Sequence, residues 1–332
     1  MALCSRHETS RHRGVAGQMQ AFATLMYHNV TDNGDRFAHL SPSVTDYFVD
    51  QQMFRAQIRE LTRCARCVDT ECVERFFEED TDPSTTASAA TKPTHSQATQ
   101  RAIQITFDDG WKGAVDLAGP ILDNEGCQGL LFVTTDLIGR PDFVTHSDLR
   151  MLDPRALCVG SHARTHRLLD RLNDFELSEE LRVSKQVLED LVGYAVTRLS
   201  VPGGGLNNRV LELAGNAGYR FVYTSQVRRN TRRSGPMNIG RVAIKRTTTM
   251  HQFQRYLAHG MWRDQLRRQV LQISKTILGS AYQPCRKWLL GENAGQADMV
   301  ELSVDSNPES HSPLTDVEDG RLVTAVSEDH AE

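Results

Sequence analysis

Two adjacent carboxylates are the residues of this sequence whose types and spacing first suggest chemistry. Asp108 and Asp109 directly follow the apolar run 103–107 and precede Gly110. Adjacent carboxylates in an apolar setting repel one another unless a cation or a shared proton relieves the repulsion. By itself, however, an Asp-Asp-Gly sequence is more typical of a simple turn than of a reactive site.

Two histidines change that interpretation. His162 and His166 are four positions apart and follow the predicted strand 157–160. On a helical turn this spacing places both imidazoles on one face, as a divalent cation requires. One carboxylate and two histidines form a facial ligand set that leaves coordination positions open to water and substrate. We therefore predict a divalent metal site, with Zn²⁺ as the expected ion and Co²⁺ or Ni²⁺ as ions that would suit the same ligands.

A second carboxylate beside such a metal suggests metal-assisted hydrolysis. The metal polarises a carbonyl and acidifies water, while the free Asp takes the proton during the attack. The glycine-rich run 202–205 follows the predicted strand 197–201, and its N–H groups would be accessible to a developing oxyanion. His28 follows the predicted strand 22–27 in the same way.

These polar clusters lie on a chain in which short apolar runs alternate with helical stretches. We predict strands at 22–27, 66–69, 103–107, 130–134, 157–160, 197–201, 220–223 and 238–244, and helices at 51–63, 71–79, 112–124, 147–152, 176–191, 208–217 and 251–257. The alternation predicts an α/β fold with a parallel sheet buried on both faces. Because no G-x-G-x-x-G turn is present, a βα barrel is favoured over a dinucleotide-binding open sheet. In such barrels the catalytic groups converge at the C-terminal ends of the strands.

The composition predicts one globular domain, 21–260, with atypical segments around and within it. Segment 1–20 has no apolar core, and 81–100 contains no Val, Leu, Ile, Phe, Tyr or Trp, so we expect neither to bury enough surface to become ordered. We interpret 81–100 as an insertion, because without it the domain and the segment 261–291 together have the usual size of a βα barrel, about 250 residues. Segment 292–332 contains eleven acidic residues and one arginine and is expected to be disordered.

Charge and hydropathy limit the partners and the location. The formal net charge is −4, yet the acidic C-terminal segment leaves the rest of the chain mildly basic. That charge suits anionic substrates or lipid headgroups but is too small to indicate nucleic-acid binding.

We expect a cytoplasmic protein, since no apolar stretch is long enough for a membrane span or placed as a signal peptide, and the seven cysteines are irregularly spaced. A helical apolar stripe in 261–282 would permit peripheral membrane contact, although such stripes more often pack on the domain. Nothing in the sequence indicates the oligomeric state.

The motifs around these residues resemble those of the polysaccharide deacetylases with a NodB-like domain. Residues 106–110 (TFDDG) are similar to the first motif of that family and 161–166 (SHARTH) to the second, while 25–28 (LMYH) resembles the opening strand of members acting in exopolysaccharide synthesis. The resemblance covers about 22–260. It implies a distorted (β/α)7 barrel and metal-dependent hydrolysis of N-acetyl groups on a polysaccharide or its lipid-linked precursor, with release of acetate.

The resemblance also implies roles for individual residues. The positions that correspond to the metal ligands of the family are Asp109, His162 and His166. Asp108 corresponds to the general base. The Gly203 amide is expected to face the oxyanion, with Pro202 and Gly204 as further substrate contacts.

Three features depart from the family pattern. The arginine that usually lies two residues before the motif proline is Ser200 here. Arg198 is the nearest candidate to replace it, and we expect Arg198 to contact the substrate. The Asp and Trp of the fourth motif have no clear counterpart. The late histidine that acts as general acid is absent from 241–244, so His28 is the expected acid or substrate contact, ahead of His251.

These departures leave two other functions open. A barrel that retained the metal without turnover would be a glycan-binding protein. The barrel and its ligands would also suit a metal-dependent amidohydrolase acting on a small non-sugar amide. The leading interpretation remains an enzyme whose partner is an N-acetylated saccharide.

Overall fold

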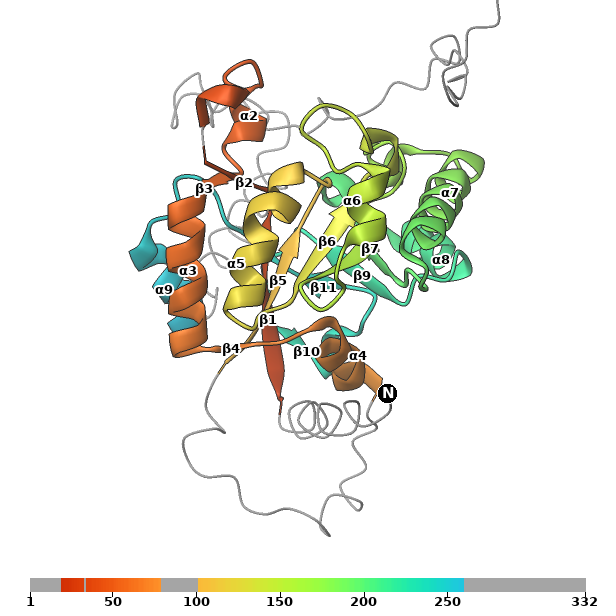
Figure 1. Cartoon of the computed structure of the whole chain (residues 1–332). Helices are drawn as coiled ribbons and strands as arrows, with labels where there is room; N and C mark the ends of the chain where they lie inside the picture. Colours follow the sequence, from red (N-terminus) through yellow and green to blue (C-terminus); the bar gives the residue numbers. More distant parts are fainter. Residues whose placement is uncertain (1–18, 33, 79–100, 260–332) are drawn as a thin grey trace, which may run out of the picture.

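The computed structural model describes residues 19–32, 34–78 and 101–259 (Figure 1). Four predicted segments lie wholly or almost wholly outside these residues: 1–20, 81–100, 261–291 and 292–332. In the described part of the chain, no helix combines the length and the apolar content needed to cross a bilayer.

The main sheet is built from parallel strands that follow one another around a barrel. In spatial order these strands are β1 (Ala21–Tyr27), β5 (Ala102–Phe107), β6 (Gly129–Val133), β7 (Leu157–Ser161), β8 (Arg198–Ser200), β9 (Phe221–Thr224) and β11 (Ile239–Gly240). The short β4 (Arg66–Cys67) pairs with the beginning of β5. The predicted α/β barrel is therefore confirmed, and the C-terminal ends of its strands meet at one end of the molecule.

A short stretch of chain closes the barrel by changing partners at Arg241. β11 pairs with β9, whereas β12 (Val242–Ala243) pairs with β1. β10 (Asn230–Thr231) runs antiparallel beside the beginning of β1. The prediction of one continuous strand over 238–244 is wrong, because this segment has to cross from one edge of the sheet to the other.

Helices surround the barrel in the predicted order. They are α3 (Gln51–Cys64), α4 (Thr70–Glu78), α5 (Gly119–Asn124), α6 (His146–Met151), α7 (Asp174–Val192), α8 (Asn208–Asn216) and α9 (Met250–His259). The helix predicted over 112–124 is present, but a π-helical turn, η3 (Ala114–Ala118), interrupts it between residues 112–113 and α5. Pro120 explains the break, since it has no N–H to continue the hydrogen-bond ladder.

Several short elements were not predicted from the sequence. They are β2 (Asn29–Thr31), β3 (Phe48–Asp50), α2 (Pro42–Thr45) and the 3-10 turns η1 (Gly34–Phe37), η4 (Thr135–Leu137), η5 (Leu169–Arg171), η6 (Pro202–Gly204) and η7 (Arg232–Ser234). β2 and β3 form a separate parallel pair. Elements of three or four residues are too short to show a hydrophobic period.

Alternating residues of each strand supply two apolar cores. Outward residues of β1 and β5, such as Leu25 and Ile105, pack in the large core that also contains residues of the surrounding helices. Inward residues such as Phe22, Leu130 and Phe221 form a second core near the start of the strands, which α4 closes. Figure 1 shows α4 at this end of β1, and α2, β2 and β3 at the opposite end. The barrel interior is thus apolar at one end, which leaves the other end for polar groups.

Candidate metal and active site

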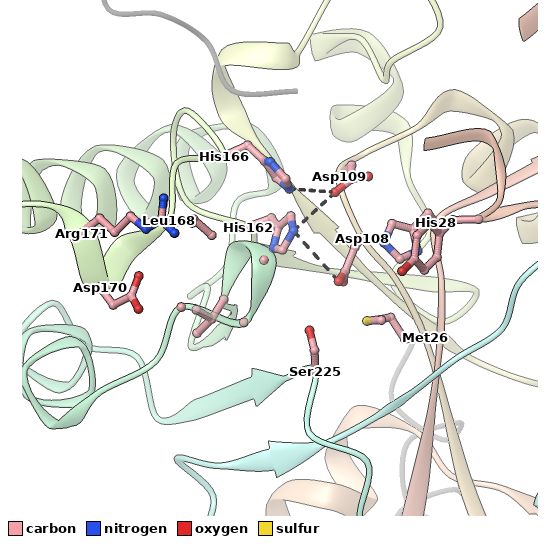
Figure 2. Close-up of a pocket in the computed structure, with 15 residues that line it drawn as sticks. Met26, His28, Asp108, Asp109, His162, His166, Leu168, Asp170, Arg171 and Ser225 are labelled. Carbon is pink, nitrogen blue, oxygen red and sulfur yellow. Dashed lines mark ion pairs between the residues drawn. The ribbon is translucent and has the colours of Figure 1, made fainter. Parts of the chain in front are cut away.

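Three predicted ligands converge at the C-terminal end of the barrel (Figure 2). Asp109 Oδ1 lies 3.4 Å from His162 Nε2 and 3.4 Å from His166 Nε2. One potential ligand atom from each residue lies within 4.8 Å of the others, and all three side chains are buried. Asp109 Oδ1 accepts no hydrogen bond from any described residue. A buried carboxylate oxygen that faces two imidazole nitrogens and lacks a hydrogen-bond donor fits a divalent cation.

A loop, not a helical turn, brings the two histidines together. The backbone between His162 and His166 is irregular, and both Ala163 (φ 61°) and His166 (φ 65°) are in the left-handed region. Glu180 of α7 accepts hydrogen bonds from the backbone N–H groups of Arg164 (2.8 Å) and Thr165 (2.9 Å), which holds the loop. The two histidines selected by their four-residue spacing therefore do lie together, but the local structure predicted for them was wrong.

Hydrogen bonds orient two of the ligands. His162 Nδ1 lies 2.8 Å from the carbonyl oxygen of Ser200, so Nδ1 carries the proton and Nε2 keeps its lone pair for a metal. Trp111 Nε1 donates to Asp109 Oδ2 at 2.9 Å, which leaves Oδ1 facing the histidines. Asp109 also has a positive φ of 74°, a backbone strain that is typical of functional sites.

Asp108 lies beside the ligand set without belonging to it. Its Oδ2 is 4.0 Å from His162 Nε2. Arg241 donates Nη1 to Oδ1 and Nη2 to Oδ2, both at 2.7 Å, and Ser200 Oγ donates to Oδ2 at 3.2 Å. This carboxylate is therefore held in one plane by a bidentate guanidinium and a hydroxyl.

Arg241 is the site residue that the sequence interpretation missed. It supplies the arginine that is absent from the motif position, which Ser200 occupies, and the Arg241 Nη2 donates to Ser200 Oγ at 2.7 Å. Arg241 is 1% exposed and enters the barrel where the chain passes from β11 to β12. In the sequence, Arg241 is noticeable only as an arginine inside the apolar segment 238–244. Nothing in its position along the chain indicates that it contacts Asp108.

Arg198, which was predicted to contact substrate, lies elsewhere. Like Ser200, two residues later on β8, it faces the inside of the barrel. Its guanidinium pairs with Glu74 of α4 and lies 5.9 Å from the ring centroid of Phe221. Two residues along a strand correspond to a shift of about 6–7 Å, and the Arg198 side chain extends further away from the metal end. The structure therefore does not bring Arg198 to the site.

A cavity of about 420 Å³ contains this site. Asp108, the three predicted ligands, His28, Gly203 and Gly204 all line it, whereas Pro202 is buried and does not line it. Lining residues that the sequence did not indicate include Met26, Tyr47, Leu168, Asp170, Arg171 and Ser225. Gly203 has a φ of 59°, and a Cβ there would lie 2.4 Å from Leu168 Cδ2, so this turn favours glycine.

His28 forms one wall of the cavity together with Tyr47. The two ring centroids are 4.4 Å apart, and His28 Nδ1 is buried without a hydrogen bond to any described residue. Burial lowers the pKa of His28, while the carboxylates of Asp109 and Asp108 act in the opposite direction. The His28 imidazole can therefore contact a molecule bound in the cavity.

The electrostatics keep both carboxylates ionised. Burial alone would raise the pKa of Asp108, but Arg241 and His162 outweigh it and the pKa is lowered. The pKa of Asp109 lies well below its ordinary value, because His162 and His166 outweigh the effect of burial. Two buried negative charges therefore face one fixed guanidinium, an arrangement that favours a further cation.

Known sequences match the part of the chain that contains residues 106–110 and 161–166. Residues 95–222 match the sequence model of the family described as polysaccharide deacetylase. The putative polysaccharide deacetylase YxkH of Bacillus subtilis is 25% identical over 145 residues, which are 44% of this chain and 52% of that protein. The peptidoglycan-N-acetylmuramic acid deacetylase PdaC of the same organism is 31% identical over 113 residues, 33% of this chain and 23% of that protein. The chain thus spans about half the length of the first relative and about a quarter of the second.

Solved structures share the fold. The deacetylase PplD of Streptococcus pyogenes, in complex with acetate, has a TM-score of 0.59 at 18% identity, covering 71% of this chain and 98% of that one. IcaB from Ammonifex degensii has a TM-score of 0.57 at 18% identity, covering 73% and 97%. Identities this low show the fold alone, whereas the family match is a match of sequence over residues 95–222. Residues 95–222 of this chain are therefore similar in sequence to the polysaccharide deacetylase family, and the barrel shares the fold of solved deacetylases.

Proposed function

We propose that this protein hydrolyses N-acetyl groups on a polysaccharide or its lipid-linked precursor and releases acetate. The observation that carries the proposal is a free carboxylate, Asp108, held beside a buried set of one carboxylate and two imidazoles in a single cavity. The family match supports the reaction class. An N-acetylated saccharide is accordingly the proposed partner.

The proposed metal ligands are Asp109, His162 and His166. Their oxygen and nitrogen donors suit Zn²⁺, and Co²⁺ or Ni²⁺ would also accept this set. When bound, the ion would supply a Lewis acid for the amide carbonyl and for water. The protein's part is to present three preformed ligand atoms, two of which are oriented by the Ser200 carbonyl and the Trp111 indole.

Asp108 is the proposed general base. Its lowered pKa keeps it deprotonated at neutral pH, so that it can accept a proton from the attacking water. The two hydrogen bonds from Arg241 hold the carboxylate plane. They also prevent Asp108 from turning to become a further metal ligand.

The glycine turn is the proposed site of oxyanion stabilisation. Gly203 and Gly204 line the cavity, and neither has a side chain that would block a substrate from the backbone. We propose that the Gly203 N–H faces the developing oxyanion. Pro202 is the buried first residue of this turn, and Gly204 would contact the sugar.

His28 is the proposed proton donor to the leaving amine. It lies in the cavity wall, and no late histidine is present in 241–244 to fill that role. His251, the other candidate, lies on α9 and does not line the cavity. A cytoplasmic location and a membrane contact through 261–282 stay predictions of the sequence.

Acetate release from N-acetylhexosamine oligomers tests the proposal. Full-length protein loaded with Zn²⁺ should release acetate, and chelation should stop the release. Asp108→Asn should lower the rate by about 10²–10⁴-fold, because it removes a general base. Asp116→Asn, the same change on an exposed side chain paired with Lys112, is the matched control and should keep the wild-type rate.

Two results would count against this function. Unchanged acetate release by Asp108→Asn would exclude Asp108 as the base. Glycan binding without any acetate release by the metal-loaded protein would favour the binding-only alternative. Parallel assays with ureides and formamides would reveal an amidohydrolase that prefers small amides.

A further inference from the structure

Trp111 connects the proposed metal site to a separate group of aromatic side chains. The indole is 2% exposed, and its Nε1–H donates to Asp109 Oδ2 at 2.9 Å. Trp111 follows Asp109 by two residues, at the point where the strand β5 has ended. The hydrogen bond therefore joins a predicted metal ligand to a side chain on the far side of the ligand from the histidines.

The indole is held on several sides. Its ring centroid is 4.1 Å from that of Phe143 in a stacked arrangement, 4.8 Å from Phe48 and 6.2 Å from Phe37, both of the latter edge-to-face. We call Trp111 and these three phenylalanines the aromatic cluster. It belongs to a small apolar core that is distinct from the two cores of the barrel. Because stacked and edge-to-face pairs restrict ring orientation, the direction of the indole N–H is restricted as well.

This direction decides which carboxylate oxygen faces the histidines. Asp109 Oδ2 is occupied by the indole, while Oδ1 is 3.4 Å from Nε2 of both His162 and His166. Without a donor at Oδ2, the carboxylate would be free to rotate about its Cβ–Cγ bond. It would then present both oxygens, or neither, to a cation.

We propose that Trp111 is a positioning residue for the metal ligand Asp109, with its indole N–H holding Oδ2 so that Oδ1 alone is presented to the cation. The inference rests on the metal site of the proposed function. It adds that metal affinity depends on the indole N–H of Trp111, on which Phe37 and Phe48 pack from before the matched residues 95–222. Hydrogen bonds to ligating side chains commonly contribute to metal affinity.

Zn²⁺ affinity of the metal-free full-length protein provides the test. Trp111→Phe keeps an aromatic ring in the cluster but removes the N–H, and a chelator competition assay should show Zn²⁺ binding weakened by about 10–100-fold. Phe143→Leu is the matched control, because it disturbs the same cluster and leaves the indole N–H in place. Its Zn²⁺ affinity should equal that of the wild type, even if its thermal unfolding temperature falls.

A second variant removes the N–H without changing the shape of the side chain. Trp262→Phe and Trp288→Phe leave Trp111 as the single tryptophan of the three in the chain. Biosynthetic replacement of that tryptophan by 3-benzothienylalanine substitutes sulfur for N–H within the same double ring. The replaced protein should lose Zn²⁺ affinity to the same extent as Trp111→Phe.

The possible outcomes separate this inference from the proposed function. Wild-type Zn²⁺ affinity in Trp111→Phe and in the benzothienyl protein would overturn the positioning role alone. Equal losses in Phe143→Leu and Trp111→Phe would also overturn it, because packing and not the N–H would then be responsible. Absence of Zn²⁺ binding by the wild type would overturn both the metal site and this inference.

Discussion

Two arginines inside the same barrel pair with carboxylates at opposite ends of it. Arg241 lies at the metal end, is 1% exposed and donates two hydrogen bonds of 2.7 Å to Asp108. Arg198 lies toward the other end and pairs with Glu74 of α4, whose side chain is 24% exposed. One pair is sealed from water, whereas the other is partly open to it.

The surroundings of the two pairs explain their different consequences. Besides Asp108, the Arg241 guanidinium also bonds Ser200, Thr106 and the carbonyl oxygen of Thr224, so its donors are distributed over three strands. Removing one partner of a buried ion pair leaves an uncompensated charge, which costs about 3–5 kcal/mol. A partly exposed pair is usually worth no more than about 1 kcal/mol. The comparison indicates that Arg241 orients Asp108, the proposed base, while Arg198 attaches α4 to the end of the barrel.

The largest expected effect is that of Arg241→Met. The substitution leaves Asp108 buried and unpaired, so the free energy of unfolding should fall by about 3–5 kcal/mol. Acetate release should fall by about 10²-fold or more, because the proposed base loses its orientation. Denaturant unfolding and the acetate assay measure the two effects. The double variant Asp108→Asn Arg241→Met should recover much of the stability that Arg241→Met loses. If the losses of the two single variants instead add, the two residues are not coupled.

A smaller effect is expected in the pH dependence of stability. The pKa of Asp108 is lowered in the folded protein, so the unfolded chain binds more protons as the pH falls. Its contribution is fully present above the ordinary carboxyl pKa of about 3.9 and is lost as the pH falls through the folded-state value. Urea unfolding of metal-free protein should show a steeper loss of stability toward acid pH for the wild type than for Asp108→Asn. Arg198→Met, in which Asp108 is intact, should keep the wild-type slope. A reduced slope in this variant would show that Asp108 is not the source of the pH dependence.

The smallest effect is expected from Arg198→Met itself. Losing the pair with Glu74 and the contact with the Phe221 ring should lower the free energy of unfolding by about 1 kcal/mol. Acetate release and Zn²⁺ affinity should remain those of the wild type, because this side chain does not line the cavity. Loss of acetate release without loss of stability would show that Arg198 also acts on the proposed site, contrary to this comparison.

The ligand set is the part of the site that the sequence predicted best. Asp108 and Asp109 follow the buried strand β5, and His162 follows the buried strand β7. The C-terminal ends of parallel strands in a barrel meet at one end of it. Residue type and position directly after a strand were therefore enough to predict that these side chains lie together. Short-range patterns also predicted most helices and strands, since hydrophobic period and capping residues are local properties.

Other features arise from contacts between residues far apart in the chain. Glu180 holds the histidine loop from α7, and Phe37 and Phe48 hold Trp111 from a segment with no periodic pattern. The predicted helical turn at 162–166 and the predicted strand at 238–244 were wrong for related reasons. Loop 162–166 is shaped by its partner on α7, and segment 238–244 by the closure of the barrel.

The sequence by itself determined which side chains can bind a cation and that they lie at one end of an α/β barrel, because both follow from residue type and local periodicity. Only the tertiary structure decided which arginine serves Asp108. Arg241 and Arg198 both face the interior from strand-forming segments, and the closure of the sheet and the position of α4 direct one to Asp108 and the other to Glu74.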